Sequence, residues 1–149
     1  MRLQLALNVD DLDEAVDFYS RMFGTEPAKR RPGYANFAVA DPPLKLVLFA
    51  GGQGDTGTIN HLGVEAETTG EVVAAEARLT GSGLATTGVG DTECCYAAKT
   101  ETWLAGPDGT RWEWYVKTGD TEQLANLPLA PTTDADDPTC CPPGATCGL

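Results

Sequence analysis

The chain has 149 residues, of which 42% are hydrophobic, so it is long enough for one domain with a substantial core. A formal net charge of −12 argues against nucleic acid or an anionic membrane surface as a partner. The N-terminal segment enters an apolar alternation at Leu3 without a charged leader, and no apolar run approaches the ~18 residues of a transmembrane helix. We therefore expect a cytoplasmic protein with neither a signal peptide nor a membrane span.

An internal repeat organises the chain from its start. The stretch from Gln4 to Gly24 aligns without gaps on the stretch from His61 to Gly81, at an offset of 57 residues. Each copy begins with the period-two alternation of a strand and continues with the spacing of an amphipathic helix. Asp11 and Thr68, each followed three residues later by a glutamate, predict the two helix starts, and the glycine that closes each copy predicts a helix end.

Short strand-like runs follow each predicted helix. The first copy continues with "YANFAVA" and "LKLVLFA", and the second with "CCYAAK", "ETWLA" and "RWEWYV". This order predicts an α+β fold made of two βαβββ modules, at about residues 1–52 and 57–118. We expect their strands to curl into a shared cup with the helices outside.

The composition changes near residue 118. Residues 119–149 contain five acidic residues, five of the ten prolines and no lysine or arginine, and they show no apolar periodicity. We interpret them as a disordered tail behind a folded domain of residues 1–118. The tail holds Cys140, Cys141 and Cys147, and an odd total of five cysteines favours reduced thiols over a disulfide framework.

Strand alternation predicts which side chains point into the cup. On the first strand, Leu5 and Leu7 belong to an apolar face that should pack beneath a helix, which turns Gln4 to the opposite face. His61 is the repeat equivalent of Gln4, so an approximate two-fold axis would bring these two side chains together. Glu113 is a carboxylate in an otherwise bulky aromatic strand, and it would complete a set of three metal-binding side chains.

An amide oxygen, an imidazole and a carboxylate resemble in charge the 2-His-1-carboxylate set that holds Fe(II) with open positions. Ordinary structural roles compete with this hypothesis. His61 could be a hydrogen-bonded strand histidine, Gln4 an edge residue, and Glu113 a cross-strand partner of Lys45 or Arg111.

Two adjacent thiols, Cys94 and Cys95, raise a separate question. Neighbouring Cα atoms lie about 3.8 Å apart, whereas disulfides usually span roughly 4.4 to 6.8 Å, so the pair is poorly placed to bridge itself. A soft, thiophilic element bound to both sulfurs would suit the pair better. The competing interpretation is two small buried residues on a strand.

The sequence resembles a known superfamily at several of these points. The repeat, with "HLGVE" opening the second half and "WEWYV" closing it, is similar to the vicinal-oxygen-chelate superfamily of glyoxalases, extradiol dioxygenases and bleomycin or fosfomycin resistance proteins. The first module, from "LNVDDLDEAVDFYSRMFG" to "LKLVLF", and "DTECCYA" resemble its arsenic and cadmium resistance branch, which includes carbon–arsenic lyases and cadmium-induced proteins.

The resemblance implies roles for five residues. Gln4, His61 and Glu113 would hold Fe(II), with Gln4 in a position that is frequently histidine in the superfamily. Cys94 and Cys95 would bind a trivalent organoarsenical such as methylarsenite by exchanging its hydroxyls for thiolates. The lyase branch further implies that dioxygen takes part in breaking the carbon–arsenic bond, which releases arsenite.

Two other classes of function stay open at this point. A sequestering protein would bind cadmium or arsenite without turnover, through the same thiols alone or together with Cys140, Cys141 and Cys147. A ligand-binding resistance protein would need neither metal nor thiols. The preferred organic group is undetermined, and a homodimer that completes the cup across two chains is an open alternative.

Overall fold

The computed structural model describes residues 1–51, 57–125 and 127–128 of the chain. In chain order these residues form β1 (Arg2–Val9), α1 (Leu12–Phe23), β2 (Lys29–Arg31), β3 (Tyr34–Val39), β4 (Leu44–Ala50), β5 (Ile59–Glu65), α2 (Thr69–Gly81), β6 (Gly90–Cys94), β7 (Ala97–Ala105), β8 (Arg111–Asp120) and β9 (Leu127–Pro128). The predicted α+β class is confirmed. Of the described helices, neither has the length and hydropathy needed to span a membrane.

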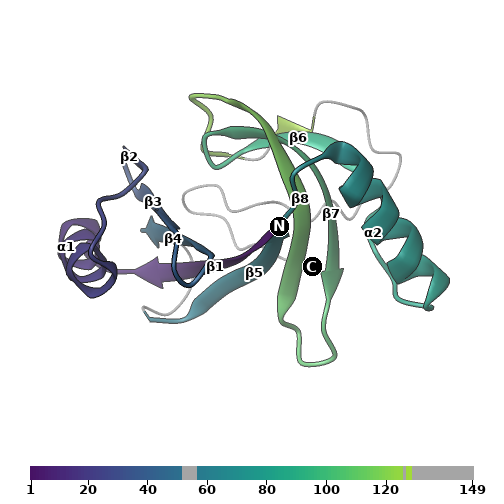
Figure 1. The fold of residues 1–149 in the computed structure, drawn as a ribbon, viewed down its shortest axis with the longest axis horizontal. Helices are drawn as coiled ribbons and strands as arrows, with labels where there is room; N and C mark the ends of the chain where they lie inside the picture. The colour runs from purple at the N-terminus through teal and green to yellow at the C-terminus, as the bar shows by residue number, and fades with distance from the viewer. Residues whose placement is uncertain (52–56, 126, 129–149) are drawn as a thin grey trace.

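One curled sheet joins the two modules, and its strand order is β2-β3-β4-β1-β5-β8-β7-β6-β9. The first strands of the modules, β1 and β5, pair antiparallel at the centre, and each has the last long strand of its own module parallel beside it, β4 or β8. This arrangement is the one that a two-fold repeat requires. The helices α1 and α2 lie at opposite ends of the molecule (Figure 1).

Local sequence explains where the helices begin and end. The Asp11 side chain accepts hydrogen bonds from the backbone of the first turn of α1, and Gly24 ends that helix at φ 62°, a conformation that glycine adopts without strain. Thr68 caps α2 in the same way. The predicted stop at Gly81 is one residue early, because Gly81 is the last helical residue and Ser82 is the cap.

The two faces of the sheet differ in character. On the outer face, α1 packs on β3 and β4, and Leu5 and Leu7 contribute to that apolar cluster as predicted. Leu3 belongs to the same alternation, yet it stays 57% exposed. The inner face carries buried polar residues, including Gln4, next to a second apolar cluster.

Two predictions about the second module need correction. The run "CCYAAK" is not one strand, because the chain turns at Cys95 and Tyr96 between β6 and β7. The run from Ala97 to Ala105 is instead one continuous strand, which includes the predicted "ETWLA". A short apolar run can continue as a strand or bend into a tight turn, and its residue types do not show which. Here the turn uses positive φ values, which non-glycine residues seldom adopt, so it could not be predicted.

The folded part also extends beyond the boundary predicted at residue 118. Strand β8 continues to Asp120, and β9 pairs antiparallel with β6. Backbone hydrogen bonds and the apolar side chain of Leu124 anchor this segment, and neither produces a periodic pattern. Residues 129–149, with Cys140, Cys141 and Cys147, lie outside the described residues, and their disorder stays a prediction.

Candidate metal and dithiol site

Three adjacent strands bring Gln4, His61 and Glu113 together on the inner face of the sheet. In the register, Gln4 of β1 lies opposite Gly63 of β5, and Gly63 lies beside Glu113 of β8. Gln4 Nε2 is 3.0 Å from His61 Nε2 and 2.9 Å from Glu113 Oε2. The distance between His61 Nε2 and Glu113 Oε2 is 3.6 Å. The predicted meeting of the repeat equivalents Gln4 and His61 is therefore confirmed.

The glycine between these strands keeps the centre of the site open. A Cβ atom at Gly63 would lie 3.2 Å from the backbone oxygen of Glu113 and 3.3 Å from Gln4 Nε2, tighter than most real contacts. A larger residue would press on the backbone of Glu113 and on the side chain of Gln4. The three polar residues are almost fully buried, with exposed fractions of 4% for Gln4, 2% for His61 and 0% for Glu113.

A buried lysine determines the charge state of Glu113. Lys99 Nζ on β7 lies 2.6 Å from Glu113 Oε1, and the lysine is 4% exposed. Burial alone would raise the pKa of Glu113, but the Lys99 ammonium outweighs burial and holds that pKa well below its ordinary value. Glu113 is therefore a carboxylate whose Oε1 faces Lys99 and whose Oε2 faces His61 and Gln4.

Lys99 was not among the residues predicted for the site. The predicted alternative, in which Glu113 is a cross-strand partner of Lys45 or Arg111, was wrong. Lys45 bonds instead to Glu65 and to the hydroxyl of Tyr115. The spacing of the strand could have indicated Lys99. Residues two apart share one face of a strand, so Lys99 lies on the same face as Ala97, Glu101 and Trp103.

The donor set suits a divalent ion such as Fe(II). Separations of 2.9 to 3.6 Å between the three donor side chains are close to the ~3 Å expected between neighbouring ligands that each lie about 2.1 Å from one ion. Among the described residues no group of three or more His, Cys, Asp or Glu could hold a metal, so a metal bound by His61 and Glu113 would need Gln4 as its third protein ligand.

Gln4 would have to change orientation to do so. Its nitrogen faces His61 and Glu113, while its Oε1 accepts a hydrogen bond of 2.7 Å from the Tyr115 hydroxyl. An amide binds a metal through oxygen, so the amide must turn over. The Tyr115 oxygen can then accept a hydrogen bond from the amide nitrogen, which keeps the turned group paired.

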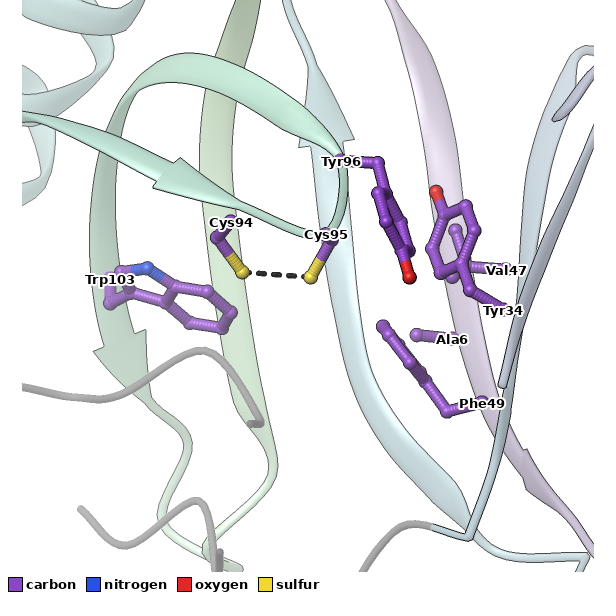
Figure 2. Packing of buried hydrophobic residues seen from close by; sticks show 8 residues of the cluster. All are labelled: Ala6, Tyr34, Val47, Phe49, Cys94, Cys95, Tyr96 and Trp103. Atoms are coloured by element: carbon purple, nitrogen blue, oxygen red, sulfur yellow. Dashed lines mark hydrogen bonds between the residues drawn. The ribbon is translucent and has the colours of Figure 1, made fainter. Parts of the chain in front are cut away.

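The two adjacent cysteines form part of the turn that joins β6 to β7. Cys95 and Tyr96 have φ values of 56° and 60°, a region that side-chain-bearing residues rarely occupy. Both thiols are buried, and their Sγ atoms lie 2.7 Å apart. In Figure 2 the two sulfurs point toward one another, with Trp103 on one side and Tyr96 on the other.

Residues beyond β8 hold this turn in place. The backbone nitrogens of Cys95 and Tyr96 donate to the carbonyl oxygens of Leu124 and Gln123, at 3.0 Å and 2.8 Å. The Lys29 ammonium donates to the carbonyl oxygen of Tyr96 at 2.9 Å. The side chain of Leu124 also packs against the apolar cluster around the thiols.

The dithiol turn, residues 94–96, and two of the three polar residues, Gln4 and His61, meet at one pocket, which Cys95 reaches from the turn. The pocket is lined by Gln4, Tyr34, Lys45, Val47, Phe49, His61, Cys95, Ala97 and Lys99. The imidazole of His61 lies between two aromatic rings, with its centroid 5.2 Å from that of Trp103 and 6.3 Å from that of Phe49. A molecule bound to Cys95 in this pocket would therefore lie in the same space as His61, beside the aromatic ring of Phe49.

Residues 3–114 match the Glyoxalase/Bleomycin resistance protein/Dioxygenase superfamily. The chain belongs to this superfamily. A trivalent organoarsenical cleaving enzyme from Thermomonospora curvata is 52% identical over 142 residues, which cover 95% of this chain and 89% of the relative. The cadmium-induced protein CadI from Mycobacterium tuberculosis H37Rv is also 52% identical, over 94% of this chain and 92% of the relative.

Solved structures of the superfamily share the fold at low sequence identity. The Mn(II)-bound glyoxalase from Novosphingobium aromaticivorans is 20% identical, with a TM-score of 0.57 over 82% of this chain and 41% of that one. Membership of the superfamily and the pairing of two modules around one pocket thus agree with the fold predicted from the repeat.

Proposed function

We propose that the protein is an Fe(II)- and dioxygen-dependent carbon–arsenic lyase that cleaves trivalent organoarsenicals such as methylarsenite. The observation that carries the proposal is the shared pocket, in which Cys95 of the dithiol turn and the Gln4 and His61 side chains line one space. The 52% identity to the organoarsenical cleaving enzyme from Thermomonospora curvata supports the same substrate class.

Cys94 and Cys95 would bind the substrate by exchange. A trivalent organoarsenical R-As(OH)2 and two thiols give R-As held by two thiolates and two molecules of water. Once one thiolate is bound, the second exchange becomes intramolecular, which strengthens binding because the effective thiol concentration reaches the millimolar range or above. The turn geometry keeps both Sγ atoms on the same side, 2.7 Å apart, so both can reach one arsenic atom.

The aromatic residues around the thiols would receive the organic group. Tyr34, Phe49 and Trp103 are between 2% and 5% exposed, and they form one apolar cluster with both cysteines. This wall excludes water and favours an apolar substituent on arsenic. It also directs that substituent toward His61, whose ring contacts Phe49 and Trp103.

Gln4, His61 and Glu113 would hold Fe(II), which supplies the activation of dioxygen that carbon–arsenic cleavage requires. Lys99 keeps Glu113 ionised and thereby available as a ligand. For methylarsenite the atoms balance as CH3As(OH)2 and O2 giving As(OH)3 and formaldehyde. Carbon is oxidised, dioxygen is reduced, and arsenic stays trivalent.

The decisive experiment begins with anaerobic protein that is reconstituted with Fe(II) and loaded with methylarsenite. Admission of oxygen should release arsenite and formaldehyde in equal amounts, and protein without Fe(II) should release neither. A Cys95→Ser variant serves as the control for substrate capture. Stoichiometric retention of methylarsenite without arsenite release would contradict lyase activity.

A second candidate is sequestration of cadmium or another thiophilic ion, which the 52% identity to a cadmium-induced protein favours. In that case the number of cadmium ions bound per chain should depend on thiols and should not change in His61→Ala. Cys140, Cys141 and Cys147, which could add thiolates, lie outside the described residues. Loss of turnover in His61→Ala with unchanged cadmium binding would separate the two functions.

A further inference from the structure

Asn60 occupies an irregular position in β5, next to His61. The pairing of β1 with β5 runs from Ala6 opposite His61 directly to Leu7 opposite Ile59, so Asn60 is the extra residue of a β-bulge. Consecutive strand residues normally point to opposite faces, and a bulge changes that alternation. As a result, the Asn60 side chain reaches the ring of its own neighbour, with Oδ1 2.7 Å from His61 Nδ1.

Asn60 is itself held by an amide on β1. Its Nδ2 donates to Asn8 Oδ1 at 3.0 Å, and Asn8 Nδ2 donates to Thr58 Oγ1 at 3.0 Å. Asn8 is 5% exposed. The backbone nitrogen of Asn8 also donates to the carbonyl oxygen of Thr58 at 3.0 Å, so the two strands are hydrogen-bonded next to the bulge, where Asn8 holds Asn60.

The direction of these hydrogen bonds follows from Glu113. An ionised carboxylate only accepts, so Gln4 must turn its NH2 group toward Glu113 Oε2. The same NH2 group faces His61 Nε2, which must therefore accept. The ring proton then resides on Nδ1 and is donated to Asn60 Oδ1, in agreement with the orientation of Asn60 toward Asn8.

We propose that Asn60, supported by Asn8, is a positioning residue that keeps the His61 proton on Nδ1 and so points the Nε2 lone pair into the metal site. The inference rests on the proposed function because it assigns a use to the lone pair, whereas the tautomer itself is independent of any metal. Hydrogen bonding of the second ring nitrogen is the usual way in which proteins orient a metal-binding histidine.

The first module shows the contrast. The repeat equivalent of Asn60 is Leu3, which is 57% exposed and pairs with Val64 of β5 in regular register. Gln4, the equivalent of His61, is oriented instead by the Tyr115 hydroxyl. The bulge and the Asn60–Asn8 hydrogen bonds therefore occur only in the module that has the histidine, and the repeat by itself does not produce them.

The experiment exploits the fact that the chain has a single histidine. Long-range proton–nitrogen NMR spectra of the metal-free protein distinguish the two ring nitrogens, and we expect the proton on Nδ1. In Asn60→Leu, which lacks the acceptor, we expect a substantial population with the proton on Nε2. The Fe(II) affinity of this variant, titrated anaerobically, should fall by about 10- to 100-fold.

Two further variants make the test specific. Asn60→Asp keeps an acceptor at the same place, so it should retain the Nδ1 proton and most of the metal affinity. Asn36→Leu removes another partly buried amide, which donates to the Tyr34 hydroxyl, and should change neither property. If Asn60→Leu does not fold, Asn8→Ala supplies the same measurement, because it leaves Asn60 present and removes only the support of its amide.

Each outcome supports or overturns the inference. An unchanged tautomer in Asn60→Leu, with or without weaker binding, would show that Asn60 only stabilises the bulge. A changed tautomer with full Fe(II) affinity would equally overturn the positioning role. Failure of the wild-type protein to bind Fe(II), with the expected tautomers in all variants, would contradict the proposed function and leave the amide chain confirmed.

Discussion

The two halves of the sheet place different side chains at equivalent positions around one pocket. Where the second half has His61 and Glu113, the first has Gln4 and Val47, and both pairs occupy matching strands beside the central β1–β5 pair. The difference shows that the repeat determines where the strands place their side chains, whereas the chemical groups at those places differ between the halves. One half contributes most of the charged and coordinating groups, and the other contributes an amide and an apolar wall.

The first hairpins of the two halves, β2–β3 and β6–β7, differ in the same way. The β2–β3 hairpin of the first half uses Gly33 at φ 69°, where glycine is unstrained. The β6–β7 hairpin of the second half uses Cys95 and Tyr96 at positive φ and is held by the backbone of residues 123 and 124. Non-glycine residues in this region cost of order 1–3 kcal/mol each, and such strain tends to gather at functional sites.

The largest effect should come from removing the charge of the carboxylate that only the second half contributes to the site. Glu113→Gln keeps an acceptor for Lys99 while it removes the carboxylate charge, so Fe(II) affinity and arsenite release should fall by at least ~100-fold. We prefer this variant to Glu113→Ala, because an uncompensated buried Lys99 would cost about 3–5 kcal/mol of stability. Anaerobic Fe(II) titration and melting curves separate the two effects.

The matched control for that variant is its repeat equivalent. Val47→Ala removes two buried methyl groups and should cost about 2 kcal/mol of stability without changing the Fe(II) affinity. Equal loss of metal binding in both variants would show that the halves contribute alike, and full activity in Glu113→Gln would remove Glu113 from the site.

The next effect concerns the strained hairpin. Cys95→Ser, and likewise Cys94→Ser, should weaken methylarsenite binding by about 10²- to 10⁴-fold, the range gained when a second contact becomes intramolecular. Metal affinity should be unchanged, because a hydroxyl substitutes for a thiol outside the ligand trio. Calorimetric titration with methylarsenite and then with Fe(II) measures both. Equal turnover of trivalent and pentavalent methylarsenicals would contradict a thiolate-bound substrate.

A truncation pair tests how the second half retains its turn. A chain that ends at Asp120 loses the carbonyl partners of Cys95 and Tyr96 and the packing of Leu124, which together should cost about 3 kcal/mol. Its arsenical affinity should also fall, by roughly tenfold, because the turn is no longer held.

A chain that ends at Pro128 keeps those partners and should match the full chain in turnover and melting temperature. Identical behaviour of both truncations would show that residues 121–128 do not position the thiols. A lower cadmium stoichiometry in the chain ending at Pro128 would instead assign a binding role to the cysteines beyond it.

The smallest effect is expected at the amide of the first half. Gln4→His makes the two halves alike at the paired position and replaces a weak ligand with a stronger one, so Fe(II) affinity should stay within a few-fold of wild type or rise. Gly63 leaves room beside this position, although its contacts with Gln4 are already short. Loss of Fe(II) binding in this variant, measured by titration, would show that the site depends on the amide itself.

Most of the plan of the molecule could be predicted from local and repeating patterns. The repeat offset and the period-two alternation together predicted two modules, their pairing and the convergence of Gln4, His61 and Glu113, because strand geometry fixes which side chains share a face. The adjacent cysteines were equally visible. Their turn was not, since neither Cys95 nor Tyr96 is a residue that usually signals positive φ.

Other features were decided only by the tertiary structure. The ion pair of Lys99 with Glu113 depends on the register of β7 against β8, and the contact of Asn60 with His61 depends on a bulge. Residues 123 and 124 bind the dithiol turn through backbone hydrogen bonds, and because every residue carries these backbone groups, the sequence does not indicate the contact. Side-chain periodicity records which face of a strand is buried, but one-residue register shifts and backbone pairings between distant segments arise only when the sheet closes, because they leave no repeating pattern in the sequence.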